Sequence, residues 1–276
     1  MNIGEFTAVI WAGSLAAGMV GALTGLGGGV VIVPLLTLGL GVDIRYAIGA
    51  SLVSVIATSS GSAVAYVREG FSNIRVGMLL EIATTLGATL GASIAAHVPT
   101  HAIAVIFGFV LIGSLYPARP GDPAADTKPD ALATRLRLDS SYPSLDGERA
   151  YHVRAVPVGF GLMGLAGALS GLLGIGSGAL KVLAMDRAMR MPFKVSTTTS
   201  NFMIGVTAAA SAGIYLRRGL VDPGLAMPTM LGVLLGSLIG ARVLARTRQI
   251  WLRRLFSVVI VALAVQMIHG GLAGRM

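Results

Sequence analysis

The chain has 276 residues, of which 54% are hydrophobic and only 12% are charged. Because soluble globular domains carry about 25% charged residues, this composition excludes an ordinary soluble domain and predicts an all-α polytopic membrane protein with the lipid bilayer as its solvent. The formal net charge of +9 does not indicate a nucleic-acid partner, because the basic residues gather at the ends of apolar runs and not on a soluble basic face.

Apolar runs divide the chain, and most have the length of about 20 residues that crosses a hydrocarbon core of roughly 30 Å. They fall at 6–23, 46–67, 76–96 and 102–116, and again at 155–173, 195–216, 223–245 and 252–269. Each set also holds a shorter apolar piece, 30–42 or 179–185, directly after a glycine-rich stretch. We interpret the two short pieces as half-helices that follow re-entrant turns.

The two halves of the chain repeat each other. An ungapped offset of 149 residues aligns 18–92 with 167–241 and gives eighteen identities in 75 positions. We therefore predict a first transmembrane repeat at 1–116 and a second at 154–276. An internal repeat in an apolar chain is typical of a secondary transporter whose site lies between its halves.

The segment between the repeats, 117–153, has a different composition, with five prolines and six acidic residues. We predict a Pro-rich polar linker that buries no core and is largely disordered, with a helical turn or two around 131–138. A tether between the repeats is the expected role, and a regulatory or partner-binding role is the alternative.

The distribution of basic residues predicts the orientation. If each half has five membrane segments, the halves are inverted, both termini lie outside and the linker is cytoplasmic. The cytoplasmic loops then hold sixteen of the 21 Lys and Arg residues, as the positive-inside rule requires. Four crossings per half would make the repeats parallel and the asymmetry poorer, so we predict two inverted repeats of five in the cell (inner) membrane.

Two glycine-rich turns occupy equivalent positions before the short helices. The candidate residues are Gly25, Gly27, Gly28 and Gly29 in the first turn, and Gly174, Gly176, Ser177 and Gly178 in the second. Glycine permits positive φ and lets backbone N–H groups face inward, and the following helix directs its positive dipole end at the loop. The turns predict a substrate site for a small anion, with close helix packing as the alternative.

Hydroxyl side chains line the segment after each short helix. We expect substrate contacts at the starts of these segments and along their polar face, from Ser51 and Thr58 in the first half and from Thr199, Ser200, Asn201 and Thr207 in the second. The alternative for each Ser or Thr is a hydrogen bond to its own helix. The pairs Gly87/Gly91 and Gly236/Gly240 have the small-xxx-small spacing that lets helices pack closely.

Lys181 is a charge within an apolar segment, which makes it a functional candidate by default. It would be a counter-ion for the anionic substrate or a proton-coupled group, and snorkelling to the interface is the alternative. Glu81 is a weaker candidate, and its alternative is a merely interfacial position, because it lies six residues after Arg75. We expect no metal site and no cofactor, because the chain has no cysteine and its four histidines are dispersed.

These motifs resemble those of the sulfite exporter TauE/SafE family of membrane transporters. The resemblance lies in the first turn, Gly25–Gly29, followed by Pro34, and in the helix starts Ala47–Ser51 and Ser196–Ser200. Ser177 and Lys181 depart from the family pattern. The resemblance implies transport of sulfite or of a small organosulfonate without ATP.

The leading hypothesis is therefore a secondary transporter of small anions that works by alternating access and couples to a proton or ion gradient. An anion channel is the alternative. An intramembrane hydrolase built on Ser177 and His269 is a remote one, because the turn matches no nucleophile motif, and we expect no enzyme activity. The sequence leaves open whether the protein is a monomer or a homodimer.

Overall fold

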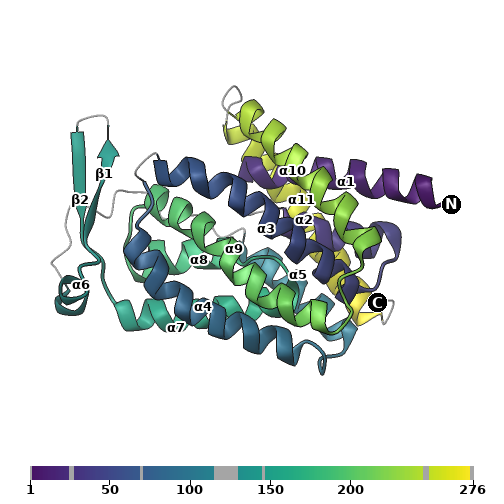
Figure 1. Ribbon diagram of the computed structural model, residues 1–276, viewed down its shortest axis with the longest axis horizontal. Helices are drawn as coiled ribbons and strands as arrows, with labels where there is room; N and C mark the ends of the chain where they lie inside the picture. Colours follow the sequence, from purple (N-terminus) through teal and green to yellow (C-terminus); the bar gives the residue numbers. More distant parts are fainter. Residues whose placement is uncertain are drawn as a thin grey trace.

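The computed structural model describes residues 2–24, 28–68, 71–114, 130–144, 147–244 and 249–273. The first half contains α1 (Ile3–Thr24), α2 (Gly29–Pro34), the π-helical η1 (Leu35–Gly39), α3 (Ile44–Arg68), α4 (Ile74–Ile94) and α5 (Thr100–Ser114). The second half contains α7 (Val156–Leu173), α8 (Gly178–Leu183), the π-helical η3 (Ala184–Ala188), α9 (Phe193–Arg217), α10 (Pro223–Leu244) and α11 (Gln249–Leu272). The described part of each apolar run is thus helical, and the described residues form an all-α bundle except for one hairpin (Figure 1).

Two of these helices, α4 and α7, are long and apolar enough by themselves to cross a bilayer. The described parts of several others form apolar helices of 10–17 residues, including Ile44–Ser60 in α3 and Pro223–Ile239 in α10. The short helices that follow the glycine turns are α2 with η1 and α8 with η3. They have the half-helix length that the sequence predicts.

Helices at equivalent positions of the two halves make equivalent contacts. α1 packs along α10, and their counterparts α7 and α4 pack along each other. The two π-helical segments begin at Leu35 and Ala184, which are separated by the same 149 residues as the sequence repeat. After each segment an amide reaches back six residues, from Val42 to Leu36 and from Met191 to Met185.

Two helices at equivalent positions, α3 and α9, run in opposite directions. Near one end of the bundle Gly49, close to the start of α3, lies against Leu220 just after α9. At the other end, the backbone N–H of Asn73, which follows α3, donates to the side-chain Oγ of Thr199 near the start of α9. α3 and α9 therefore run antiparallel, and they cross where Ser59 meets Gly205.

Glycines bring the paired helices into backbone contact. A Cβ on Gly87 of α4 would lie 2.0 Å from the carbonyl oxygen of Gly164, and one on Gly91 would lie 2.0 Å from that of Ala168. In the equivalent pair, a Cβ on Gly236 of α10 would lie 2.0 Å from the carbonyl oxygen of Leu15. The predicted packing role of these three glycines is confirmed.

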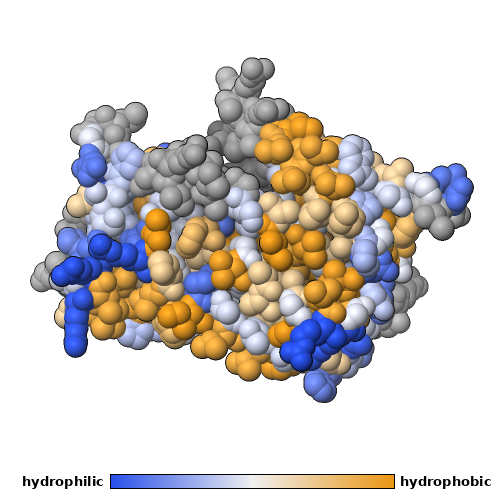
Figure 2. All heavy atoms as spheres, viewed as in Figure 1, coloured by the Kyte–Doolittle hydropathy of each residue, from blue (hydrophilic) through white to orange (hydrophobic). Residues whose placement is uncertain are grey.

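On the face of the bundle that Figure 2 shows, the described surface is mostly apolar in the middle and more hydrophilic towards the two ends. On α4 the side chains at every fourth position are more than half exposed: Met78, Ile82, Leu86, Leu90 and Ile94. Many of the buried side chains, in contrast, are polar, including Ser51, Lys181 and Thr207. Apolar residues outside and polar residues inside fit a bundle surrounded by hydrocarbon.

The segment between the halves has more structure than we expected. Its described part forms α6 (Ala131–Arg135), within the predicted turn, and then an antiparallel hairpin of β1 (Ser140–Ser144) and β2 (Gly147–Tyr151). The hairpin projects from the end of the bundle opposite the start of α1 and the end of α11 (Figure 1).

The expectation that this segment buries no core is wrong for its described part. Leu138 and Tyr151 are at most 2% exposed and pack with Met185 and Met189 in one cluster. Asn73 caps α4 and also donates its side-chain amide to the Leu138 carbonyl and the Tyr151 hydroxyl. The segment buries a core because it uses the apolar surface that the ends of the membrane helices provide.

Candidate functional site

The second glycine turn lies at mid-depth in the bundle. Gly174 and Gly176 have φ of +69° and Ser177 has φ of +48°, so the turn uses the left-handed backbone that glycine at these positions permits. A Cβ on Gly176 would meet Val55 of α3 and Ile204 of α9. Each of these two residues is the twelfth of a 25-residue helix, and they are equivalent in the repeat.

The first glycine turn meets the second at this point. A Cβ on Gly29, at the start of α2, would lie 2.8 Å from the Ser51 Oγ and 3.0 Å from the Gly174 carbonyl oxygen. Gly28 is also buried, against Val233 of α10. The predicted site residues Gly25 and Gly27 lie outside the described residues.

Several donors in the second turn have no partner among the residues that the structure describes. The amide N–H groups of Ile175, Gly176 and Ser177 donate to no acceptor there, although all three residues are buried. The Ser177 Oγ is buried and also makes no hydrogen bond. Buried donors without partners are rare in proteins, so this cluster has the chemistry to bind a group rich in acceptors.

The two equivalent serines hold the carbonyl groups of this turn. The Ser51 hydroxyl donates to the Gly174 carbonyl at 2.7 Å, and the Ser200 hydroxyl donates to the Gly178 carbonyl at 3.2 Å. Both serines are buried. They fix the turn through its Gly174 and Gly178 carbonyls, while the amides of Ile175, Gly176 and Ser177 have no partner in the described chain.

Three other candidates lie further from the turn. The Thr199 Oγ accepts from the backbone N–H of Asn73, and the Thr58 Oγ donates to its own helix at Ser54. The Asn201 side chain makes no hydrogen bond with the described part of the chain, and the residue is half-buried. The structure does not bring these side chains together with the turn.

Lys181 is fully buried, so the snorkelling alternative is wrong. Its Nζ donates to the Oγ of Thr207, which donates in turn to Glu81 Oε1 at 2.7 Å. The Lys181 Nζ also lies 4.0 Å from Glu81 Oε2, and the Glu81 side chain is only 12% exposed. The interfacial alternative for Glu81 is therefore wrong, because α4 runs alongside α9 and presents this carboxylate near the middle of that helix.

The sequence itself contains a signal that favours a functional role for Glu81. Charged side chains within membranes pair with one another, and Glu81 and Lys181 are opposite charges inside two different apolar runs. Nothing in the sequence, however, shows that the two runs are neighbours.

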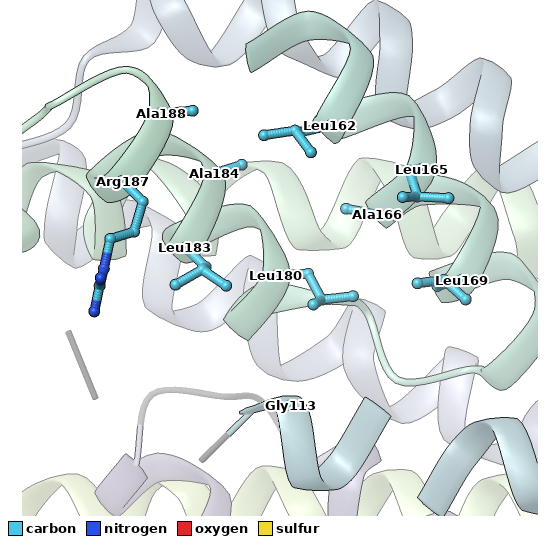
Figure 3. A pocket seen from close by; sticks show the side chains of 10 residues that line it. All are labelled: Gly113, Leu162, Leu165, Ala166, Leu169, Leu180, Leu183, Ala184, Arg187 and Ala188. Carbon is cyan, nitrogen blue, oxygen red and sulfur yellow. The ribbon is translucent and has the colours of Figure 1, made fainter. Parts of the chain in front are cut away.

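A separate cavity of about 580 Å³ lies between the end of α5 and the outer faces of α7, α8 and η3 (Figure 3). Leu162, Leu165, Leu169, Leu180 and Leu183 line most of it, and Arg187 is its one charged lining residue. Such an apolar wall offers almost no hydrogen-bond donors to an anion, so this cavity is not a candidate substrate site.

The arrangement does not support a hydrolase. Ser177 is buried in the turn, whereas His269 is exposed near the end of α11, so the two do not form a nucleophile and base. Among the described residues no group of three His, Asp or Glu side chains could hold a metal ion.

The apolar exterior, the polar and charged side chains buried inside and the broken helices define a polytopic helical membrane protein. The sequence pattern of the sulfite exporter TauE/SafE family matches residues 10–267, so the chain belongs to this family of membrane transporters.

Known relatives carry names of the same kind. YunE, a probable membrane transporter protein of Bacillus subtilis strain 168, is 29% identical over 266 residues, which cover 94% of this chain and 96% of YunE. A probable membrane transporter protein of Xylella fastidiosa strain 9a5c is 28% identical over 272 residues and 97% of each chain. YdhB of Bacillus subtilis strain 168, also a probable membrane transporter protein, is 25% identical over 229 residues, or 82% of this chain and 85% of YdhB. No solved structure matches the chain.

Proposed function

We propose that this protein is a secondary transporter that carries a small anion, sulfite or an organosulfonate, between its two halves. The observation that carries the proposal is the second glycine turn, where three buried amides and the Ser177 hydroxyl have no partner among the described residues. Amide and hydroxyl donors are the groups that bind oxyanions at helix starts and glycine loops. The family description supports sulfite and related sulfur oxyanions as the substrate class.

The proposed mechanism is alternating access by two inverted repeats of five membrane segments each. It is supported by the opposite directions of α3 and α9. In the same way α5 runs antiparallel to its counterpart α11, since Gly108 lies against Ile268 and Gly271 against His101. The turn meets α3 and α9 at equivalent residues, so rocking one half against the other opens it to either side without displacing it.

The proposed orientation places the hairpin in the cytoplasm and both termini outside the cell (inner) membrane. At the hairpin end lie eight basic residues whose side chains the structure describes: Arg75, Arg135, Arg137, Arg149, Arg154, Arg187, Arg190 and Lys194. The opposite end has three: Arg45, Arg217 and Arg218. This excess supports the orientation through the positive-inside rule.

The test is counterflow in proteoliposomes loaded with unlabelled anion and diluted into labelled sulfite or methanesulfonate. A carrier exchanges one substrate for another and accumulates label transiently, whereas a channel only dissipates the gradient. Dissipation without counterflow would establish the anion channel instead, and the absence of any anion flux would refute the proposed function.

The site itself is tested by Ser177→Ala. We expect at least about a tenfold loss of anion affinity, the equivalent of about 1.4 kcal/mol, without a change in thermal stability, because the hydroxyl stabilises no part of the described fold. Ser14→Ala is the matched control, since the Ser14 hydroxyl is also buried without a partner but lies in α1, away from the turn. Equal affinity in both variants and the wild type would exclude Ser177 from the site.

A further inference from the structure

The two halves are joined by a chain of three polar side chains. Lys181 in α8 donates to Thr207 in α9, and Thr207 donates to Glu81 in α4. α4 belongs to the first half, whereas α8 and α9 belong to the second. Thr207 is the fifteenth of the 25 residues of α9, so the chain crosses between the halves near mid-depth.

Glu81 is the charge that compensates Lys181. Of the elements around the pair, α7 carries no titratable side chain. On α9 the charged residues are Lys194 and Arg217, at its two ends, and η3 contributes Asp186 and Arg187, whose side chains lie 4.0 Å apart. Arg75 of α4 is at the hairpin end, where it donates to the Arg137 carbonyl.

The two carboxylate oxygens of Glu81 have different surroundings. Oε1 accepts from both Thr207 and Thr85. Oε2 is buried and accepts no hydrogen bond within the described chain, and its neighbour is the Lys181 Nζ at 4.0 Å. This oxygen can therefore take up a proton without breaking any of those hydrogen bonds.

We propose that Glu81 is the proton-binding site that couples anion transport to the proton gradient, an inference that rests on the proposed function. When Glu81 is ionised, it compensates the Lys181 charge, and an anion at the turn is not required as a counter-charge. When a proton binds Oε2 and forms an O–H bond, the carboxyl group is neutral and the buried ammonium group has no counter-charge. That state is strongly unfavourable until an anion binds at the turn, where Ser177 lies one helical turn before Lys181.

Proton and anion therefore bind together and cross in the same direction, one proton for each monovalent anion. Because the linkage is reciprocal, the anion raises the affinity of Glu81 for its proton by the same factor. On the opposite side the anion leaves, Oε2 releases its proton to that medium, and the Lys181–Glu81 attraction is restored.

The experiment compares Glu81→Gln with the wild type in proteoliposomes. Gln mimics the protonated carboxyl group, so we expect counterflow to persist in this variant while a proton gradient no longer drives accumulation. We also expect anion affinity in the wild type to rise as the pH falls, and to be independent of pH in Glu81→Gln. The probes are labelled sulfite and methanesulfonate, the second because its charge is constant over the pH range. Glu148→Gln, the same change in the exposed hairpin, is the matched control and should behave as the wild type.

The outcomes separate the two proposals. Wild-type counterflow that a proton gradient does not affect, or a Glu81→Gln variant that still accumulates anion against its gradient, overturns the coupling and leaves the carrier intact. A wild type without counterflow overturns the proposed function and the coupling with it.

A second variant keeps the test decisive if Glu81→Gln does not fold. Combining Glu81→Gln with Lys181→Met removes both charges. This double variant therefore leaves no unpaired buried charge, whereas removing one partner alone leaves one. We expect this double variant to fold, to bind anion at least tenfold more weakly, and to show no pH dependence of affinity. A double variant with the pH dependence of the wild type would overturn the proposal.

Discussion

The left-handed turn at mid-depth gives a quantitative prediction for Gly176→Ala. An L-residue in the left-handed region costs about 1–2 kcal/mol, and φ at Gly176 is +69°. The new Cβ would also lie 2.9 Å from Ile204 Cγ2 and 3.1 Å from Val55 Cγ1, an overpacking that costs about 1–3 kcal/mol. The sum predicts that this variant loses roughly 2–5 kcal/mol of unfolding free energy.

Equilibrium unfolding in mixed detergent micelles measures this loss. Gly213→Ala is the matched control, because Gly213 lies in α9 with nothing within 4 Å of its Cβ position, so we expect it to be unchanged or more stable by up to about 1 kcal/mol. If Gly176→Ala were as stable as Gly213→Ala, the turn would not be held in this conformation, and the argument for its free amides would fail.

Three more changes probe the packing of the helices and of the hairpin segment. Gly87→Ala should lower the unfolding free energy by about 3 kcal/mol or more, because its Cβ would lie 2.0 Å from a backbone oxygen of α7. Gly161→Ala is the control and should not lower it, because nothing lies within 4 Å of that Cβ position. Equal melting temperatures of the two variants would contradict this prediction. Asn73→Ala removes a helix cap and two hydrogen bonds to the hairpin segment. We therefore expect the unfolding free energy to fall by about 2–3 kcal/mol and proteolysis of the hairpin to become faster. An unchanged cleavage rate would show that the hairpin docks without Asn73. Burial raises the pKa of Tyr151 to about 12, above its unfolded value of about 10. Stability is therefore constant below about pH 10 and falls between about pH 10 and 12, and Tyr151→Phe should flatten that fall.

The helices could be predicted from the sequence because their signals are local. Apolar runs about as long as a bilayer is thick gave the positions of the long helices, and the glycine stretches gave the breaks before α2 and α8. The duplication gave the two halves. The positive φ of Gly174 and Gly176 and the close approach at Gly87 and Gly236 follow from what glycine alone permits.

The hairpin could not be predicted in this way. Its composition resembles that of disordered linkers, and its strands are stabilised by contacts with helices that lie far away in the sequence. Tyr151 is buried because Asn73 and the methionines of η3 and its flanks are present at that end of the bundle. The two π-helical segments likewise have no local signal beyond their place in the repeat.

The sequence by itself determined the class of protein, its duplication, the two glycine turns and the candidate charge at Lys181, since hydrophobic length, repeat spacing and glycine content act over short stretches of chain. Only the tertiary structure decided which groups meet: that Ser51 and Ser200 hold the carbonyls of the second turn, and that Lys181 faces Glu81 through Thr207. These residues lie on different helices, and for Glu81 and Lys181 on different halves. Their proximity depends on how the helices pack, and it is that packing that leaves one set of buried donors free and joins one pair of buried charges.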